Sequence, residues 1–350
     1  MKERYINGIQ QVGIGVADAK RAFDWYKTML GTDILVFEDT ATASLMQRYT
    51  GNVAQQRYAM LAMNLQGGGG LEIWQYTQRI PAEPVAPVQL GDLGIFAIKI
   101  KCRNIESAYA HLSNKGQSTA IATHPGGWPH FFMRDAWGNH FNVVQNENLF
   151  AKGPHATGGV AGALIGVSDL KKSQQFYADV LGYSEVLYSG EASYPDWQAV
   201  DGAGGNYKRL VLGCNKKTTG AFGHLLGDTT IELVQALDRQ PIKIYAHRYW
   251  GDCGFMHLCF DINGMEAHEQ ICATAGYPFT VNSRNSFDMG KAAGHFAYNE
   301  DPDGTLIEYV ETHKVPILKK WGWYLNLAHR NPEKPLPHWM VKCLRFSRVK

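Results

Sequence analysis

A carboxylate near the end of the chain is the first candidate for chemistry. Glu308 stands in "DPDGTLIEYV" (301–310), among residues that suit a half-buried strand directly after a turn. A carboxylate that points into such a strand is costly unless it is paired or holds a metal. His257 has a similar setting, inside the apolar stretch "GFMHLCFDI" (254–262). The sequence therefore predicts a compensating partner for Glu308.

The chain repeats its own pattern, and the repeat defines the elements that must position these residues. The stretch "VGIGVADAKRAFDWYKTMLG" (12–31) matches "ALIGVSDLKKSQQFYADVLG" (163–182), and 91–116 matches 251–276 in the same way. An Asp stands where a helix N-cap belongs and a Gly where a helix ends. We therefore expect four units of one strand, a helix and further strands. The residues near the start of each closing strand are Glu72, Asn142, Glu232 and Glu308.

Length and composition bound the class of protein. The 350 residues are 45% hydrophobic and 19% charged, which is typical of a soluble globular chain with room for two domains. A polar linker near 146–158 suggests domains at 1–150 and 151–313, followed by an extension at 314–350. No apolar run approaches the ~20 residues of a membrane span, and the first residues lack a secretory signal. We expect a cytoplasmic protein that binds neither membrane nor nucleic acid.

The cysteines and the C-terminal extension have simple interpretations. The six cysteines are scattered without a CxxC pair, which favours free thiols over disulfides or a thiolate zinc site.

Residues 315–350 carry eight Lys or Arg against one acidic residue. A nucleic-acid or membrane surface is one interpretation of this basic aromatic tail. We prefer a strap packed on the body, with the basic residues solvated and the aromatic ones buried, namely Trp321, Trp323, Tyr324 and Trp339.

Four βαβββ units with acidic closing strands resemble the vicinal oxygen chelate superfamily of glyoxalases, epimerases, extradiol dioxygenases and resistance proteins. The resemblance covers about 1–313 and implies an α+β fold in which four βαβββ modules form two paired open β-barrel cups. In that family a cup holds one divalent metal, with ligands from the first and last strands of each module. The first-strand ligand usually lies seven residues before the helix-capping Asp.

This rule selects one pair of positions in each module: Gln11 with Glu72, Ala97 with Asn142, Gly162 with Glu232, and His257 with Glu308. Sequential pairing of modules three and four implies the ligands Glu232, His257 and Glu308. A swapped pairing of modules one and four, and of two and three, implies Gln11, Glu72, His257 and Glu308. We prefer the swapped pairing because it assembles four ligands in one cup, although it leaves Glu232 without a metal.

The ligand set then implies a reaction class. Nitrogen and oxygen ligands without thiolates suit one divalent ion such as Zn, Ni, Mn or Fe. We expect a small substrate whose neighbouring oxygens are polarised while Glu308 or Glu72 moves a proton through an enediolate-like intermediate. That describes an isomerase, epimerase or lyase of glyoxalase type, acting as a monomer or homodimer.

Two other functions stay open. A ring-cleaving or related Fe(II) dioxygenase of this superfamily would need a second histidine, such as His224 or His295. A binding or sequestration protein would hold a small molecule without converting it.

Strand alternation predicts what else faces the cup, since residues two apart share a face. Gly13 and Gly15 would leave room beside Gln11. The other expected pocket residues are Trp74, Cys259 and Asp261. His124 and His130, in "HPGGWPH" (124–130), are candidates for a loop that closes over a pocket.

Overall fold

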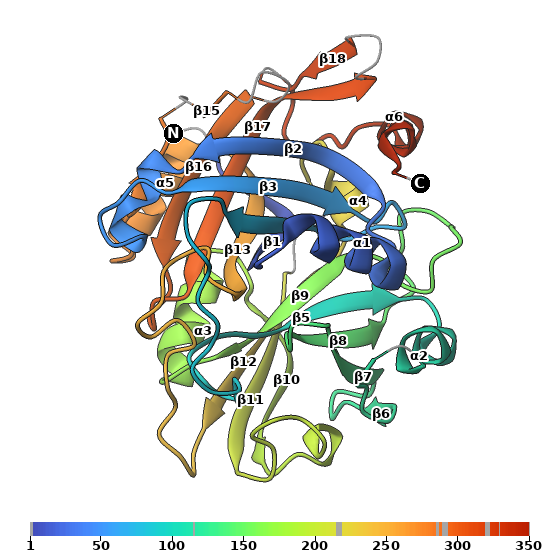
Figure 1. Cartoon of the computed structure of the whole chain (residues 1–350), viewed down its shortest axis with the longest axis vertical. Coiled ribbons are helices and arrows are strands. Elements are labelled where there is room, and N and C mark those ends of the chain that lie inside the picture. The colour runs from blue at the N-terminus through green and yellow to red at the C-terminus, as the bar shows by residue number, and fades with distance from the viewer. Residues whose placement is uncertain are drawn as a thin grey trace.

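The protein is described from a computed structural model. The structure describes residues 3–114, 116–214, 219–284, 287–288, 293–318, 323–328 and 330–349. Its strands form two sheets, one above the other in Figure 1, and the helices lie around them.

The first sheet joins the first and fourth modules. Its strand order is β14-β16-β17-β13-β1-β4-β3-β2, with β15 paired to β16 and β18 paired to β17. Module one supplies β1 (Tyr5–Gly15), β2 (Ile34–Thr42), β3 (Gln56–Met63) and β4 (Gly70–Tyr76). The remaining strands are β13 (Gly254–Asn263), β14 (Val281–Asn282), β15 (Phe287–Asp288), β16 (Ala293–Glu300), β17 (Leu306–Leu318) and β18 (Trp323–Asn326).

The second sheet joins the second and third modules in the order β10-β11-β12-β9-β5-β8-β7-β6. Module two supplies β5 (Gly94–Cys102), β6 (Ala122–Thr123), β7 (Pro129–Arg134) and β8 (His140–Gln145). Module three supplies β9 (Val160–Gly166), β10 (Glu185–Ala192), β11 (Tyr207–Gly213) and β12 (Thr230–Ala236). Each sheet therefore takes strands from both halves of the chain, and the two curled sheets confirm the paired cups expected from the sequence.

The helices begin where their capping residues predict. Asp18 accepts a hydrogen bond from the backbone N–H of Arg21 at the start of α1 (Ala19–Leu30), and Asp169 caps α3 (Leu170–Asp179) in the same way. Gly31 ends α1 in the left-handed conformation, at φ +63°. The other helical segments are η1 (Ser44–Tyr49), α2 (Ile105–Ser113), η2 (Pro195–Trp197), α4 (Gly223–Leu226), α5 (Met265–Thr274), α6 (His338–Lys342) and η4 (Cys343–Ser347).

The main apolar core contains residues from both sheets and from the helices that pack against them. Strand β1 shows how the sequence divides between core and cup. Val12 and Ile14 are completely buried in the core. Because strand side chains alternate, Gln11 and Gly13 face the opposite side, into the cup. The seam between β1 and β13 is antiparallel and places the fourth module directly beside the first.

The C-terminal extension continues the first sheet through β18 and then forms α6 and η4. Its last described residue, Val349, bonds to Asp33 just before β2. Trp321 lies outside the described residues, as does the side chain of Trp323. Tyr324 is half-buried, whereas Trp339 is 60% exposed, so the expectation of a buried aromatic is wrong for Trp339. No helix among the described residues is long and apolar enough to span a bilayer.

Candidate metal centre

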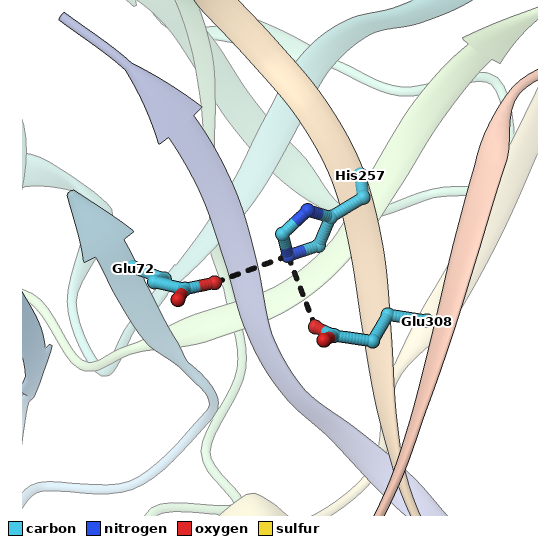
Figure 2. A group of neighbouring side chains, drawn as sticks. All are labelled: Glu72, His257 and Glu308. Atoms are coloured by element: carbon cyan, nitrogen blue, oxygen red, sulfur yellow. Dashed lines mark ion pairs between the residues drawn. The ribbon is translucent and has the colours of Figure 1, made fainter. Parts of the chain in front are cut away.

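Three side chains from three strands converge in the cup of the first sheet. Nε2 of His257, on β13, lies 3.1 Å from Oε2 of Glu308 on β17 and 3.4 Å from Oε2 of Glu72 on β4. Figure 2 shows the imidazole edge between the two carboxylates. One ligand atom from each residue lies within 4.8 Å of the others, and this is the only such group of three found among the described residues.

Gln11 completes the set from β1. Its Nε2 donates hydrogen bonds to Oε2 of Glu72 at 3.3 Å and to Oε2 of Glu308 at 3.5 Å. The Oε1 atom is buried without a hydrogen-bond partner. The structure thus brings together all four residues that the swapped pairing implies.

Strand register explains why these residues meet. Gly13 is the register partner of both His257 on β13 and Glu72 on β4. Cys259 is the partner of Gln11 on one side and of Glu308 on the other. The ligands therefore occupy two adjacent rows across four neighbouring strands. A Cβ on Gly13 would lie 2.2 Å from Cε1 of His257, so the space that the sequence assigned to an open floor holds the imidazole.

Two carboxylates and an imidazole lie close together in this site, and each shifts the pKa of its neighbours. Burial lowers the pKa of His257, but the Glu308 and Glu72 carboxylates outweigh burial and raise this pKa to about 9. For Glu308, burial raises the pKa, and the opposing effect of His257 holds it below the usual value. The cluster thus stabilises an imidazolium between two carboxylates, a place that a divalent cation would fill with greater charge.

The donor set fits a divalent metal on two observations. His257 Nε2 lies near both carboxylates but makes no directed hydrogen bond to either of them. Gln11 has a buried, unpartnered Oε1, which would face the carboxylates if the amide oxygen and nitrogen exchanged places. One imidazole nitrogen and three oxygens are a donor set that zinc, nickel, manganese or iron accepts.

Two aromatic residues support these ligands, and sequence reasoning missed both. The Tyr298 hydroxyl donates to Oε1 of Glu308 at 2.7 Å, and Nε1 of Trp250 donates to Nδ1 of His257 at 3.3 Å. Tyr298 is the β16 register partner of Glu308, so a hairpin alignment of 295–310 could have found it. Trp250 lies in a loop, and no strand alignment or motif in the sequence marks it. The donation from Trp250 to Nδ1 requires the neutral ring with its proton on Nε2, because an imidazolium and a ring that binds metal through Nε2 both carry a proton on Nδ1.

A cavity of about 1290 Å³ opens beside the cluster, and its lining includes Gln11, Glu72 and Glu308. Trp74 lines this cavity and packs edge-on against Trp250, with ring centroids 4.6 Å apart. Asp261 also lines the cavity, where it accepts hydrogen bonds from Asn7 and Gln10. Cys259 is completely buried, and its side chain contacts Gln10.

The structure places Glu232 in the second sheet, apart from His257 and Glu308, so the alternative ligand set is not assembled. Nζ of Lys99 lies 2.6 Å from Oε2 of Glu232, and Nε of Arg209 donates to Oε1 of Glu232 at 2.6 Å. Burial would raise the pKa of Glu232, but these two cations hold it well below the ordinary value. In the cup of the second sheet, internal ammonium and guanidinium groups thus supply the positive charge.

Several predicted histidines have other roles. His124 lies in the loop between β6 and β7 and His130 lies on β7, and both are buried, beside Glu232 and Asp196 respectively. Asn142 bonds to the His130 ring at 2.9 Å. His224 contacts the ring of His338, and His295 bonds to Asn282 at 2.6 Å. Among the described residues, neither His224 nor His295 joins the three-residue cluster.

Comparisons with known proteins agree with this architecture. The family model described as "Glyoxalase/Bleomycin resistance protein/Dioxygenase superfamily" matches residues 8–143 and 155–309. A candidate dioxygenase from Bacillus subtilis aligns with a TM-score of 0.58 and 15% identity, over 88% of this chain and 86% of that one. Glyoxalase I from Zea mays aligns with a TM-score of 0.51 and 16% identity, over 88% and 92%. A search of curated proteins gave no significant sequence match. The chain belongs to the glyoxalase, bleomycin resistance protein and dioxygenase superfamily.

Proposed function

We propose that this protein is a divalent-metal enzyme that moves a proton on a carbon beside a carbonyl, as an isomerase, epimerase or lyase of glyoxalase type. The observation that carries the proposal is the convergence of Gln11, Glu72, His257 and Glu308 in one cup, beside a cavity. A metal held there would act as a Lewis acid on two neighbouring substrate oxygens. The structural similarity to glyoxalase I supports the fold of such an enzyme.

The two carboxylates differ in how firmly the chain holds them, and the difference suggests their roles. Glu308 receives the Tyr298 hydroxyl on one oxygen and lies against His257 with the other. Glu72 lacks such a hydroxyl among its described hydrogen bonds, and its side chain is 13% exposed against 8% for Glu308. Glu308 therefore serves as the anchored ligand. Glu72 is the group free to take a proton from substrate in the cavity and return it.

The Fe(II) oxygenases of this superfamily use two histidines and one carboxylate as metal ligands, whereas this cluster has one histidine, two carboxylates and an amide. That donor set favours proton transfer over oxygen activation. The cytoplasmic location and the monomeric or homodimeric state expected from the sequence remain part of the proposal.

The test is deuterium exchange at carbon. Metal-loaded protein is incubated in D₂O with a panel of α-hydroxyketones and α-ketoaldehyde thiol adducts, and incorporation is followed by NMR. We expect exchange in the wild type, and about 10²- to 10⁴-fold slower exchange in Glu72→Gln with its metal retained.

Other outcomes would redirect the assignment. Oxygen consumption with Fe²⁺ and a catechol, without carbon exchange, would favour the dioxygenase. Tight binding of a panel compound without any turnover would favour a binding protein.

A further inference from the structure

The cavity beside the metal centre continues far beyond the ligands. Its lining includes Glu72, Glu308 and Trp74. Its lining also includes an apolar group from β2, β3, the α4 region and the C-terminal extension: Ile34, Met63, Phe222, Leu225, Tyr324 and Leu344. Ile34 and Leu225 belong to a separate buried apolar cluster, against which Met63, Phe222 and Leu344 pack. A substrate that occupied only the metal end would leave this apolar wall uncovered.

The C-terminal extension holds that apolar end in place. The backbone N–H of Val349 donates to the Asp33 carbonyl at 2.8 Å, and Nε of Arg348 lies 3.0 Å from the Asp33 carboxylate. Leu336 donates to the Ala221 carbonyl at 2.9 Å, which ties the extension to the segment before α4. Figure 1 shows α6 and the C-terminus at the side of the first sheet where β2 begins. Tyr324 and Leu344 lie beyond residue 309, where the family match ends, so the extension adds these two residues to a wall whose other members lie within the matched ranges.

The charges around the cavity limit what can enter. Besides the two ligand carboxylates, its lining carries Glu38, Asp39 and Asp261. Among the described residues of this lining, Arg57 is the one Lys or Arg, and it pairs with Asp39 at 3.2 Å. An anionic group on the substrate would therefore meet like charges, and the described part of the lining offers no unpaired Lys or Arg to bind it. Thiol peptides and phosphate-bearing carriers are poor matches for this cavity.

We infer that the substrate is an elongated molecule with a pair of neighbouring oxygens at one end and an uncharged apolar chain that lies under the C-terminal extension. The position of the oxygen pair rests on the proposed function, whereas the apolar chain site stands on the cavity lining alone. Burial of a chain against Phe222 and Leu344 gives about two- to fourfold in affinity per methylene.

The probes are n-alkyl hydroxamic acids from two to twelve carbons, because they carry two neighbouring oxygens and a variable chain. With metal-loaded wild type, affinity should rise about two- to fourfold per methylene until the cavity is full. A terminal carboxylate on the longest chain should weaken binding by at least about tenfold. Affinity independent of chain length, or equal affinity for the carboxylate-ended chain, would overturn the inference.

Variants locate the chain. Leu344→Arg and Phe222→Arg should remove most of the gain from long chains and leave acetohydroxamate unaffected. Leu344→Trp, which keeps the wall apolar, should shorten the chain length at which affinity stops rising. Leu237→Arg, at an exposed leucine directly after β12 and outside the cavity lining, is the matched control and should match wild type. Long-chain affinity that is unchanged in Leu344→Arg and in Leu344→Trp would place the chain elsewhere and refute the site.

A neutral apolar fluorophore, N-phenyl-1-naphthylamine, separates this inference from the proposed function. His257→Ala should lose hydroxamate binding but still bind the fluorophore. Leu344→Arg should lose the fluorophore but still bind acetohydroxamate. If wild type binds the fluorophore but no hydroxamate, the metal proposal fails while the apolar site stands. If it binds hydroxamates without binding the fluorophore, the apolar site fails alone.

Discussion

Gly13 and His257 face each other across the seam between the first and fourth modules. They are register partners, and a Cβ on Gly13 would lie 2.2 Å from Cε1 of the imidazole. Real Cβ atoms do not approach so closely, so the ring occupies the place of the missing side chain. The metal centre therefore depends on a glycine that contributes no ligand atom.

Gly13→Ala should displace His257 and lower metal affinity by at least about tenfold. Overpacking should also cost about 1–3 kcal/mol of unfolding free energy. The measurements are metal titration and denaturant unfolding. Gly205→Ala is the matched control, because a Cβ there meets its nearest atom at an ordinary 3.6 Å. Equal metal affinity in Gly13→Ala and wild type would show that the ring does not bind from this position.

Tyr298→Phe should weaken metal binding without changing the ligands. The variant removes the hydroxyl that donates to Oε1 of Glu308 at 2.7 Å, and partners of this kind typically contribute about 10- to 100-fold to metal affinity. Competition with a calibrated chelator measures the change. Tyr188→Phe, in the second sheet, is the control. Unchanged affinity in Tyr298→Phe would mean that Glu308 is not held by this hydroxyl when metal is bound.

Metal affinity should depend steeply on pH. Burial lowers the pKa of His257, but Glu308 and Glu72 raise it to about 9 in the metal-free site, so a proton must leave the ring before Nε2 can bind a metal. Affinity for Zn²⁺ should therefore rise about tenfold per pH unit from pH 6 to pH 8, toward the pKa. A fluorescent zinc indicator can follow this range. A flat profile would show that His257 is neutral at these pH values or is not a ligand.

The second cup should contribute stability through its ion pairs. Lys99→Met removes the ammonium 2.6 Å from Glu232 and leaves a buried carboxylate with less compensation, which should cost about 3 kcal/mol. Lys27→Met, which removes the partner of exposed Asp24, should cost no more than about 1 kcal/mol. Denaturant unfolding compares the two. Equal small losses would mean that Arg209 alone satisfies Glu232.

The same carboxylate predicts acid sensitivity. The pKa of Glu232 lies well below its ordinary value in the fold, because the opposing effect of Arg209 and Lys99 exceeds that of burial. Its contribution to stability is therefore complete above the unfolded-state pKa of about 4.5 and is lost as the pH falls below that value. The loss of unfolding free energy between pH 5 and pH 3 should be smaller in Glu232→Gln than in wild type. An identical loss would show that Glu232 is not ionised in the fold.

The resemblance to the superfamily selected the candidate ligands, and local patterns supported the selection. Gln11 lies seven residues before the capping Asp18, and Glu308 follows a turn within an apolar strand. The internal repeat predicted the four modules. The pairing of β1 with β13 joins segments about 250 residues apart, and only the count of ligands per cup favoured it over the sequential pairing.

What the sequence could not predict depends on contacts between modules. Trp250 reaches His257 from a loop, and the Arg209 guanidinium meets Glu232 from a neighbouring strand without a spacing rule. Gly and Pro around His124 and His130 indicate a loop, which holds for His124, whereas His130 lies on β7, and tertiary packing buries both. The apolar end of the cavity required the C-terminal extension, which the repeat does not cover.

Elemental mass spectrometry of the untagged protein tests the central claim most directly, with wild type beside Gln11→Ala, His257→Ala and Glu232→Gln. We predict one divalent ion per chain in wild type and in Glu232→Gln, and its loss in His257→Ala and Gln11→Ala. Metal lost in Glu232→Gln but retained in Gln11→Ala and His257→Ala would contradict the site in the first sheet, and no metal in wild type would contradict a metal enzyme altogether.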